Sequence, residues 1–172
     1  MAKQPESNIV FELYEDGTNF MGLTQATLPN IAFIVQQING AGLGGNVDVP
    51  IAGMMEAMEL SLNWRSPTEA AKSLAAIKSH HLDLRVAAQY WDTTASEYGV
   101  EADKYVMVAR PKAMNPGNVQ SATAADTANT FSVVYYAGYR DGQLLWEIDP
   151  YNYICNIDGV DYFAPIRKAL GK

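Results

Sequence analysis

The chain has 172 residues, of which 48% are hydrophobic and 18% are charged, and its formal net charge is −7. This composition suits one folded domain spanning 1–172 and argues against disorder, while the acidic balance argues against tight binding of nucleic acid. The single cysteine, Cys155, excludes an internal disulfide and favours a packed thiol. No apolar run approaches the roughly 20 residues of a membrane span, and the N-terminus lacks the apolar region of a signal peptide.

The first part of the chain predicts strands. Residues 8–14 and 20–23 are apolar and flank Asp16-Gly17, a dipeptide typical of tight hairpin turns. A third apolar run, 31–38, follows a proline, which is tolerated at the start of a strand because no ladder donor is lost there.

The segment 39–53 is rich in glycine and lacks a periodic apolar pattern, so we expect a long functional loop. Within this segment, residues 40–45 match the motif G-x-G-x-x-G. A dinucleotide site also needs a helix to begin at the end of that motif, whereas the following residues, 46–50, end in a proline. The sequence therefore favours a flexible loop over a nucleotide site.

Residues 55–64 alternate between apolar and polar side chains, which predicts a strand with one face in the core. Glu59, Ser61 and Asn63 share the polar face. The next segment, 66–78, predicts a helix, because it opens with a capping box and a proline at the first helical position and continues with an apolar stripe.

The second half of the chain predicts further strands at 82–90, 104–110, 130–139, 143–148 and 151–157. Two more Asp-Gly pairs, at 141–142 and 158–159, predict turns. The polar and small residues of 113–128 predict an exposed loop, and no internal repeat or second domain is evident. The expected fold class is mainly β (α+β).

Residues that could carry chemistry are few and poorly grouped. His80 and His81 are adjacent on a predicted strand, so their side chains point to opposite faces and cannot readily bind one ion. The carboxylate pairs Glu15/Asp16 and Glu147/Asp149 show no sign of a cleft, so we interpret them as solvated or interface groups. No serine lies in a nucleophile elbow. We therefore expect no enzyme activity, no metal and no cofactor.

Several stretches, in order along nearly the whole chain, resemble the major tail tube proteins of contractile phages and of phage-derived R-type bacteriocin particles. They are Asp16-Gly17 with Asn19-Phe20-Met21-Gly22, Thr27-Leu28-Pro29, Met55-Glu56-Ala57-Met58-Glu59, Glu147-Ile148-Asp149-Pro150, Ile157-Asp158-Gly159-Val160-Asp161, and Arg167 before Leu170-Gly171. The loop 113–128 departs from the pattern, as does Asp158, where relatives often carry asparagine.

The resemblance implies an antiparallel β-sandwich or barrel-like fold with one flanking helix, and six-subunit rings that stack helically into a tube. It implies that the long loop contacts the next ring, through Gly40, Gly42, Leu43, Gly44, Gly45, Val47 and Val49. The implied partners are other copies of the chain, a tail sheath protein outside, baseplate and tail terminator proteins at the ends, and a tape measure protein or DNA in the lumen, without membrane anchoring. The implied location is the tail of a virion or bacteriocin particle assembled in the host cytoplasm.

If strands of the six subunits form an inner barrel, one polar strand face must line a water-filled channel. We expect this face to carry Glu59, Ser61 and Asn63, with Thr130 and Ser132 as a second candidate set. Acidic and neutral walls would repel a DNA backbone and let it slide without tight binding.

Two other interpretations remain open from the sequence. A tube protein of a type VI secretion system would share the same architecture. A small β-barrel that binds a ligand belongs to another class, and its mass in solution would separate it, since it would stay a monomer or a small oligomer.

Overall fold

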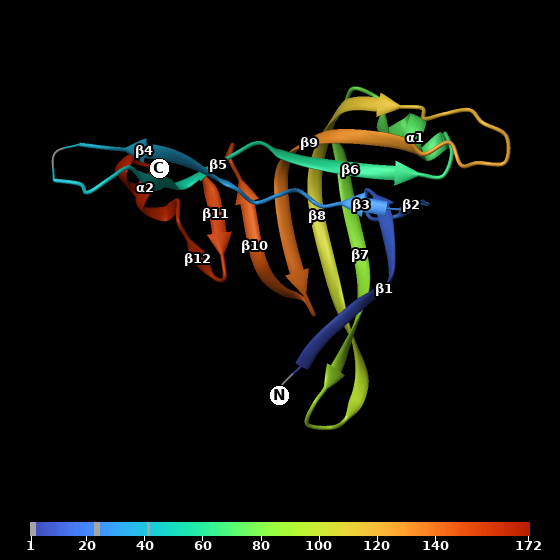
Figure 1. Cartoon of the computed structure of the whole chain (residues 1–172), viewed down its shortest axis with the longest axis horizontal. Coiled ribbons are helices and arrows are strands. Elements are labelled where there is room, and N and C mark those ends of the chain that lie inside the picture. Colours follow the sequence, from blue (N-terminus) through green and yellow to red (C-terminus); the bar gives the residue numbers. More distant parts are fainter. Residues whose placement is uncertain (1–2, 23–24, 41) are drawn as a thin grey trace.

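The computed structural model describes residues 3–22, 25–40 and 42–172, so the predicted positions Leu23 and Ala41 lie outside it. Figure 1 shows a molecule built almost wholly of strands. The elements, in chain order, are β1 (Lys3–Glu15), β2 (Asn19–Met21), β3 (Gln25–Thr27), β4 (Phe33–Ile38), β5 (Val47–Met55), β6 (Met58–Trp64), α1 (Glu69–Leu74), β7 (His80–Asp92), β8 (Glu97–Asn115), β9 (Thr127–Arg140), β10 (Gln143–Asp149), β11 (Ile154–Ile157), β12 (Val160–Asp161) and α2 (Ala164–Ala169).

Ten strands form one antiparallel sheet in the order β12-β11-β10-β9-β8-β7-β1-β2, with β6 added to β9 and β3 added to β6. The sheet divides because β9 changes its partner part-way along. Residues 127–133 pair with β6, whereas residues 136–140 pair with β10. A bulge between Val108 and Ala109 of β8 lies at the same level, and bulges bend and twist a strand.

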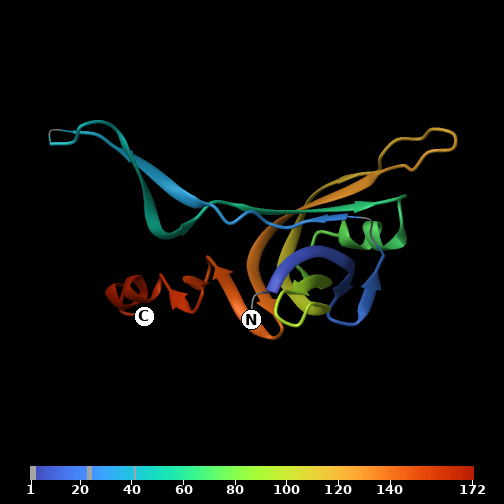
Figure 2. The same cartoon turned by 60° about the horizontal axis from the view of Figure 1, so that its bottom comes forward.

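The division gives two layers that face each other, as Figure 2 shows. We call the first the β6 layer, which comprises β3, β6, residues 127–133 of β9 and residues 110–115 of β8. The second, the β7 layer, comprises β1, β2, β7 and the rest of β8 and β9, continued by β10 to β12. The core lies between the layers and under α1, and its largest buried apolar side chains are Trp64, Tyr136, Phe131, Leu13, Leu60, Leu62, Leu74, Leu82, Met107 and Ile148.

The mainly β fold predicted from the sequence is confirmed, and so are its three Asp-Gly turns. Both residues of each pair have positive φ, for example 53° at Asp16 and 74° at Gly17. Two successive residues with positive φ are the requirement of the two-residue hairpin turn that matches the twist of the strands. The turns at 141–142 and 158–159 have the same backbone conformation.

The predicted helix 66–78 is shorter in the structure. α1 covers only Glu69–Leu74, and its N-cap is Thr68, whose side chain accepts a hydrogen bond from Ala71 N at 3.1 Å. The predicted capping box is therefore wrong, because Ser66 and Pro67 precede the N-cap. The chain leaves the helix early because His80 must enter β7 with its side chain buried. Ile77, predicted to lie on the apolar stripe, is consequently 99% exposed.

The predicted loop 39–53 is largely a strand. β5 covers Val47–Met55 and pairs with β4, so the two strands form a hairpin whose connection is only residues 39–46. The hairpin is a separate two-stranded sheet and projects from one end of the molecule in both views (Figures 1 and 2).

Several boundaries in the second half differ from the prediction: β7 covers His80–Asp92 and β8 begins at Glu97, so both strands are longer than expected. β8 runs to Asn115 and β9 starts at Thr127, so the loop there is 116–126. The strand predicted at 151–157 begins only at Ile154, because the Asp149 side chain first accepts hydrogen bonds from the backbone N–H groups of Tyr151 and Asn152. The short helix α2, which contains a proline in its first turn, was not predicted.

Candidate assembly surfaces

The two sets of polar residues predicted to line a lumen lie on one face of the β6 layer. In the antiparallel register Glu59 is opposite Ser132, and Ser61 is opposite Thr130. Residues opposite each other in a ladder point to the same side of the sheet. Asn63 extends this face toward β3, where its side-chain amide donates a hydrogen bond to Gln25 Oε1 at 3.4 Å.

The charge on this polar face is balanced within the chain. Lys112 of β8 donates a hydrogen bond to the Glu59 carboxylate, and both side chains are about half exposed. Lys112 is not among the residues expected on this face, because residue 112 lies between a predicted strand and a predicted loop. With Glu59 neutralised by its partner, the face is polar but not acidic, so the repulsion of DNA expected from Glu59 is weaker than the sequence indicates.

A buried hydrogen-bond network fixes the β6 layer to α1. Trp64 Nε1 donates to Asn129 Oδ1 at 3.0 Å, and Asn129 Nδ2 donates to the Ala71 carbonyl oxygen, also at 3.0 Å. All three residues are buried. Since buried polar groups without partners are costly, this network holds the sheet, and with it the polar face, in one position against the helix.

One face of the β4–β5 hairpin is uncharged and mainly apolar, and the other carries its charged residue. Ile38 lies opposite Val47, and Gln36 lies opposite Val49, so Ile38, Val47, Val49 and, two residues further on, Ile51 share a side with Gln36. The opposite side carries Val35 and Pro50 together with Gln37, which donates a hydrogen bond to Asp48 at 3.3 Å. The apolar side chains are exposed, 44% for Val47 and 45% for Leu43 in the connection.

The predicted inter-ring residues all lie on the hairpin or its tip: Gly40, Gly42, Leu43, Gly44, Gly45, Val47 and Val49, each of them exposed. The glycines leave open space around their α-carbons. The motif 40–45 is followed by β5, so no helix N-terminus lies at its end to bind a pyrophosphate.

The base of the hairpin rests on the C-terminal segment. Gly53 has φ +75°, and its α-carbon faces the ring of Phe163, which a Cβ would meet at 3.1 Å. Phe163 is in turn held by Asp161, whose carboxylate accepts hydrogen bonds from Phe163 N at 3.0 Å and from Arg167 Nη2 at 2.6 Å. Phe163 is absent from the residues predicted from the sequence, although a glycine before a Met-rich run can indicate a close approach of another segment.

The histidines and Glu15, considered above as groups that could carry chemistry, are either exposed singly or paired with each other in the fold. His80 is buried and His81 is exposed, as their predicted opposite faces require. Glu15, expected to be a solvated or interface group, is instead buried within the chain, and its Oε1 lies 2.5 Å from His80 Nδ1. The prediction was wrong because the turn after β1 folds Glu15 back onto the exit of α1, which sequence distance hides.

The remaining candidates are likewise engaged or isolated. Glu147 accepts a hydrogen bond from the Tyr135 hydroxyl at 2.9 Å. Cys155 is buried, and desolvation raises the pKa of its thiol, with the charge of Asp161 adding to the effect. In the described part of the chain no cluster of His, Cys, Asp or Glu could hold a metal ion. None of the helices within 3–22, 25–40 and 42–172 has the length and hydropathy needed to span a membrane.

The model of one family, the phage tail tube protein FII, matches residues 6–171. The chain belongs to this family. A curated relative, the tail tube protein of Escherichia phage P2, is 28% identical over 173 residues, which cover 97% of this chain and 98% of the relative. The resemblance noted in the sequence is thereby confirmed: the protein is a structural subunit of an inner tail tube.

Solved structures show the same fold. A chain in the sheath/tube terminator of the extracellular contractile injection system PVC aligns with a TM-score of 0.54 and 13% identity, over 76% of this chain and 94% of that chain. A chain of the PVC sheath–tube complex aligns with a TM-score of 0.51 and 12% identity, over 75% and 87%. Both structures represent the extended state of that system.

Proposed function

We propose that six copies of this chain close into a ring and that rings stack into a hollow tube, through which DNA or a tape measure protein passes without tight binding. The observation that carries this proposal is the polar face of the β6 layer, which is partly exposed and carries the Lys112–Glu59 ion pair, with Arg110 beside Ser132 at its edge. A water-filled channel needs such a wall.

The edges of the β6 layer support closure into a ring. Residues 110–115 of β8 pair with β9 on one side, whereas β7 ends its pairing at Ala109. At the other edge, β3 pairs with β6 alone. An open sheet edge is a template for another strand, and closure around a ring removes it. We infer that the β3 edge of one copy lies beside the β8 edge of its neighbour.

The hairpin supports stacking. A two-stranded sheet is marginal in water without a further partner, yet β4–β5 exposes an apolar face built from Ile38, Val47, Val49 and Ile51. We propose that this face, with the tip at Gly40 and Gly42–Gly45, contacts the next ring. Deleting residues 42–47 should leave a folded monomer that no longer polymerises.

The partners of the tube follow from the relatives. The PVC structures that share this fold are named as a sheath–tube complex and a sheath/tube terminator. We propose a sheath protein around the tube and a terminator and baseplate at its ends, in a particle assembled in the bacterial cytoplasm. The structural role of the family supports a tube without enzyme activity or cofactor, in an infectious phage or a bacteriocin particle.

The lumen assignment can be tested by chemical labelling. Ser61→Cys places a thiol on the polar face, and Val119→Cys places one on the fully exposed loop 116–126 as a matched control. Assembly should slow the reaction of the first thiol with a bulky polymer-linked maleimide and leave the second unchanged. If assembly slows neither thiol, or slows both equally, in tubes verified by electron microscopy, the lumen assignment is contradicted. If no tubes form at all, the proposed function itself is contradicted.

The absence of tight DNA binding can be checked by gel shift at low salt. Assembled tubes should not retain duplex DNA, because the wall offers its phosphates few basic groups, and one of them, Lys112, is already paired with Glu59. Replacing Glu59 by Gln should leave Lys112 without its partner and increase retention, which provides the positive control.

A further inference from the structure

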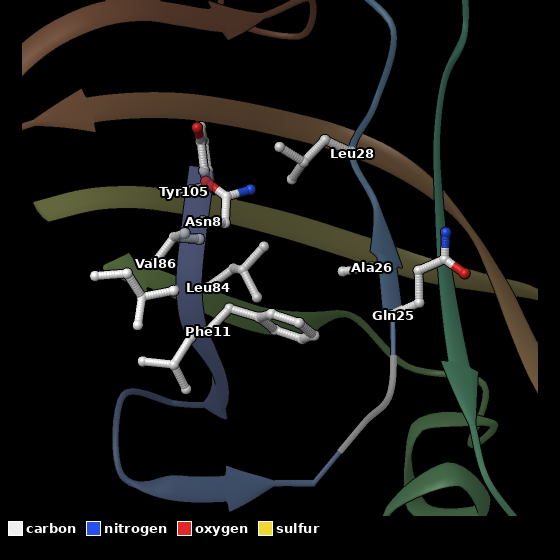
Figure 3. Close-up of a pocket in the computed structure, with 10 residues that line it drawn as sticks. Asn8, Phe11, Gln25, Ala26, Leu28, Leu84, Val86 and Tyr105 are labelled. Carbon is white, nitrogen blue, oxygen red and sulfur yellow. The ribbon is translucent and has the colours of Figure 1, made fainter. Parts of the chain in front are cut away.

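An apolar groove opens between the two layers on the side of β1. It has a volume of about 570 Å³ and is lined chiefly by Ile9, Phe11, Leu28, Leu84, Val86 and Tyr105. Figure 3 shows Ala26 and Leu28, from the β3 side, pointing across the groove toward Phe11 and Leu84. We call this feature the β1 groove. Its walls come from β1, β7, β8 and residues 25–28, of which Gln25 also accepts the hydrogen bond of Asn63 on the polar face.

The rim of the groove exposes apolar side chains to water. Ile9 is 53% exposed and Val10 is 55% exposed, because β1 bulges between Asn8 and Val10. The polar residues at the groove, Asn8 and Gln25, are uncharged. Contiguous apolar surface of this kind marks a contact site, and a partner that covers it would bury no charge there.

The backbone of β1 argues against simple strand addition at this site. Its outer edge pairs with β2 only from Leu13 to Glu15, so the earlier residues have a free edge among those described. A second bulge between Pro5 and Ser7, together with the proline itself, interrupts the ladder that an added strand would need. The groove is therefore suited to apolar side chains that insert from a neighbouring surface.

We propose that the β1 groove receives the apolar face of the β4–β5 hairpin from a second copy of the chain. The hairpin carries the large exposed apolar surface that matches it, formed by Ile38, Val47 and Val49 with Leu43 at the tip. The charged group of the hairpin, Asp48, lies on the opposite side with Gln37. The contact therefore joins two uncharged apolar surfaces and leaves Asp48 in water.

The hairpin cannot fill the groove of its own chain. In both overall views it extends away from β1, toward the opposite end of the long axis (Figures 1 and 2). A contact between unlike surfaces of two identical chains is heterologous, and where its rotation does not close into a ring it can repeat along a stack. This inference rests on the proposed tube and adds to it the surface that accepts the hairpin.

Crosslinking provides a direct test. The double variant Leu43→Cys with Ile9→Cys should give, on oxidation of assembled protein, a ladder of disulfide-linked multimers on non-reducing gels. Each single variant should give none, and the native Cys155 is buried in all of them. Leu43→Cys combined with Val119→Cys is the matched control and should give no ladder.

A charge inserted into the groove gives a second test. Ile9→Glu should raise the concentration needed for assembly at least about tenfold, because an unpaired carboxylate would be buried in the contact. Ile77→Glu, at a fully exposed apolar residue outside the groove, should have no such effect. Circular dichroism of the monomer checks that both variants fold.

The outcomes separate this inference from the proposed tube. If wild-type protein forms tubes and Ile9→Glu forms them equally well, or if tubes give no Leu43–Ile9 ladder, the groove is not the hairpin's site although the tube stands. A small apolar molecule retained in the groove of assembled tubes, detected by native mass spectrometry, would also overturn it. If the wild type forms no tubes at all, the proposed function fails first.

Discussion

The ring of Phe163 lies against the α-carbon of Gly53, so that the segment before α2 supports the base of the β4–β5 hairpin. The contact joins residues 110 positions apart, and only a glycine leaves room for it. The direction in which the hairpin projects is thus set in part by the C-terminal segment, which otherwise has few buried side chains.

Gly53→Ala should lower the free energy of unfolding by about 1–2 kcal/mol, because an alanine at positive φ is strained and its Cβ would press on Phe163. Chemical denaturation measures this change. Gly44→Ala is the matched control, since open space surrounds Gly44 and its φ is not positive. Similar stability of the two variants would show that the Phe163 contact does not constrain the hairpin.

His80→Ala should destabilise the protein by about 3 kcal/mol, because it leaves the buried Glu15 carboxylate without the ring nitrogen that lies 2.5 Å from it. The substitution also removes the other ring nitrogen of His80, Nε2, so the Ala76 carbonyl oxygen loses a 3.0 Å hydrogen bond. His81→Ala removes the neighbouring exposed histidine and should change the unfolding midpoint little. A larger loss of stability in His81→Ala than in His80→Ala would contradict the importance of the buried pair of His80 and Glu15.

Asn129→Ala should cost about 2 kcal/mol, since it removes the partners of both Trp64 Nε1 and the Ala71 carbonyl in a buried site. Thermal unfolding followed by circular dichroism measures the loss. Asn118→Ala, in the exposed loop after β8, is the control. Loss of assembly together with this destabilisation is expected, because α1 then no longer holds the β6 layer.

The C-terminal segment should lose stability in acid. Burial alone would raise the pKa of Asp161, but hydrogen bonds from Arg167 and from the backbone N–H groups of Phe163 and Cys155 outweigh it and lower the pKa below 3.8. A lowered folded-state pKa means that the ionised group stabilises the fold above its unfolded pKa. That contribution is lost as the pH falls through the folded-state pKa.

Urea unfolding of wild type and Asp161→Asn from pH 5 to about pH 2.5 checks this window. The variant should be less stable at pH 5, and the difference should shrink as the pH falls. Asp158→Asn is the control, because Asp158 is exposed in a turn at φ 52°, a conformation that asparagine also tolerates. A difference that stays constant with pH would exclude Asp161 as the titrating group.

The strands and turns could be predicted from the sequence because their signals are local. Alternation over 55–64 placed Glu59 and Ser61 on one face, and the structure joins them with Thr130 and Ser132 in a single register. The Asp-Gly pairs determine their turns through backbone conformation alone. Whether this face lines a lumen stays a prediction.

The remaining features depend on contacts between distant segments. Glu15 meets His80 across 65 positions, and Lys112 meets Glu59 across 53, so neither pair could be read from spacing. Most of β5 falls in the predicted loop 39–53, because the glycines and Pro50 obscure its alternation, whereas β4 lies in the predicted strand 31–38. The early end of α1 follows from the burial of His80, a tertiary effect that the capping box does not encode.

The hairpin projects from one end of the molecule, and the β1 groove lies away from it, in the body formed by the two layers. A stack built from this contact has polarity: one terminal ring displays hairpins with no groove to enter, and the opposite ring displays empty grooves. Proteins that close the two ends must therefore recognise different surfaces. Subunits that add to the end with free hairpins and subunits that add to the end with empty grooves can therefore add at different rates.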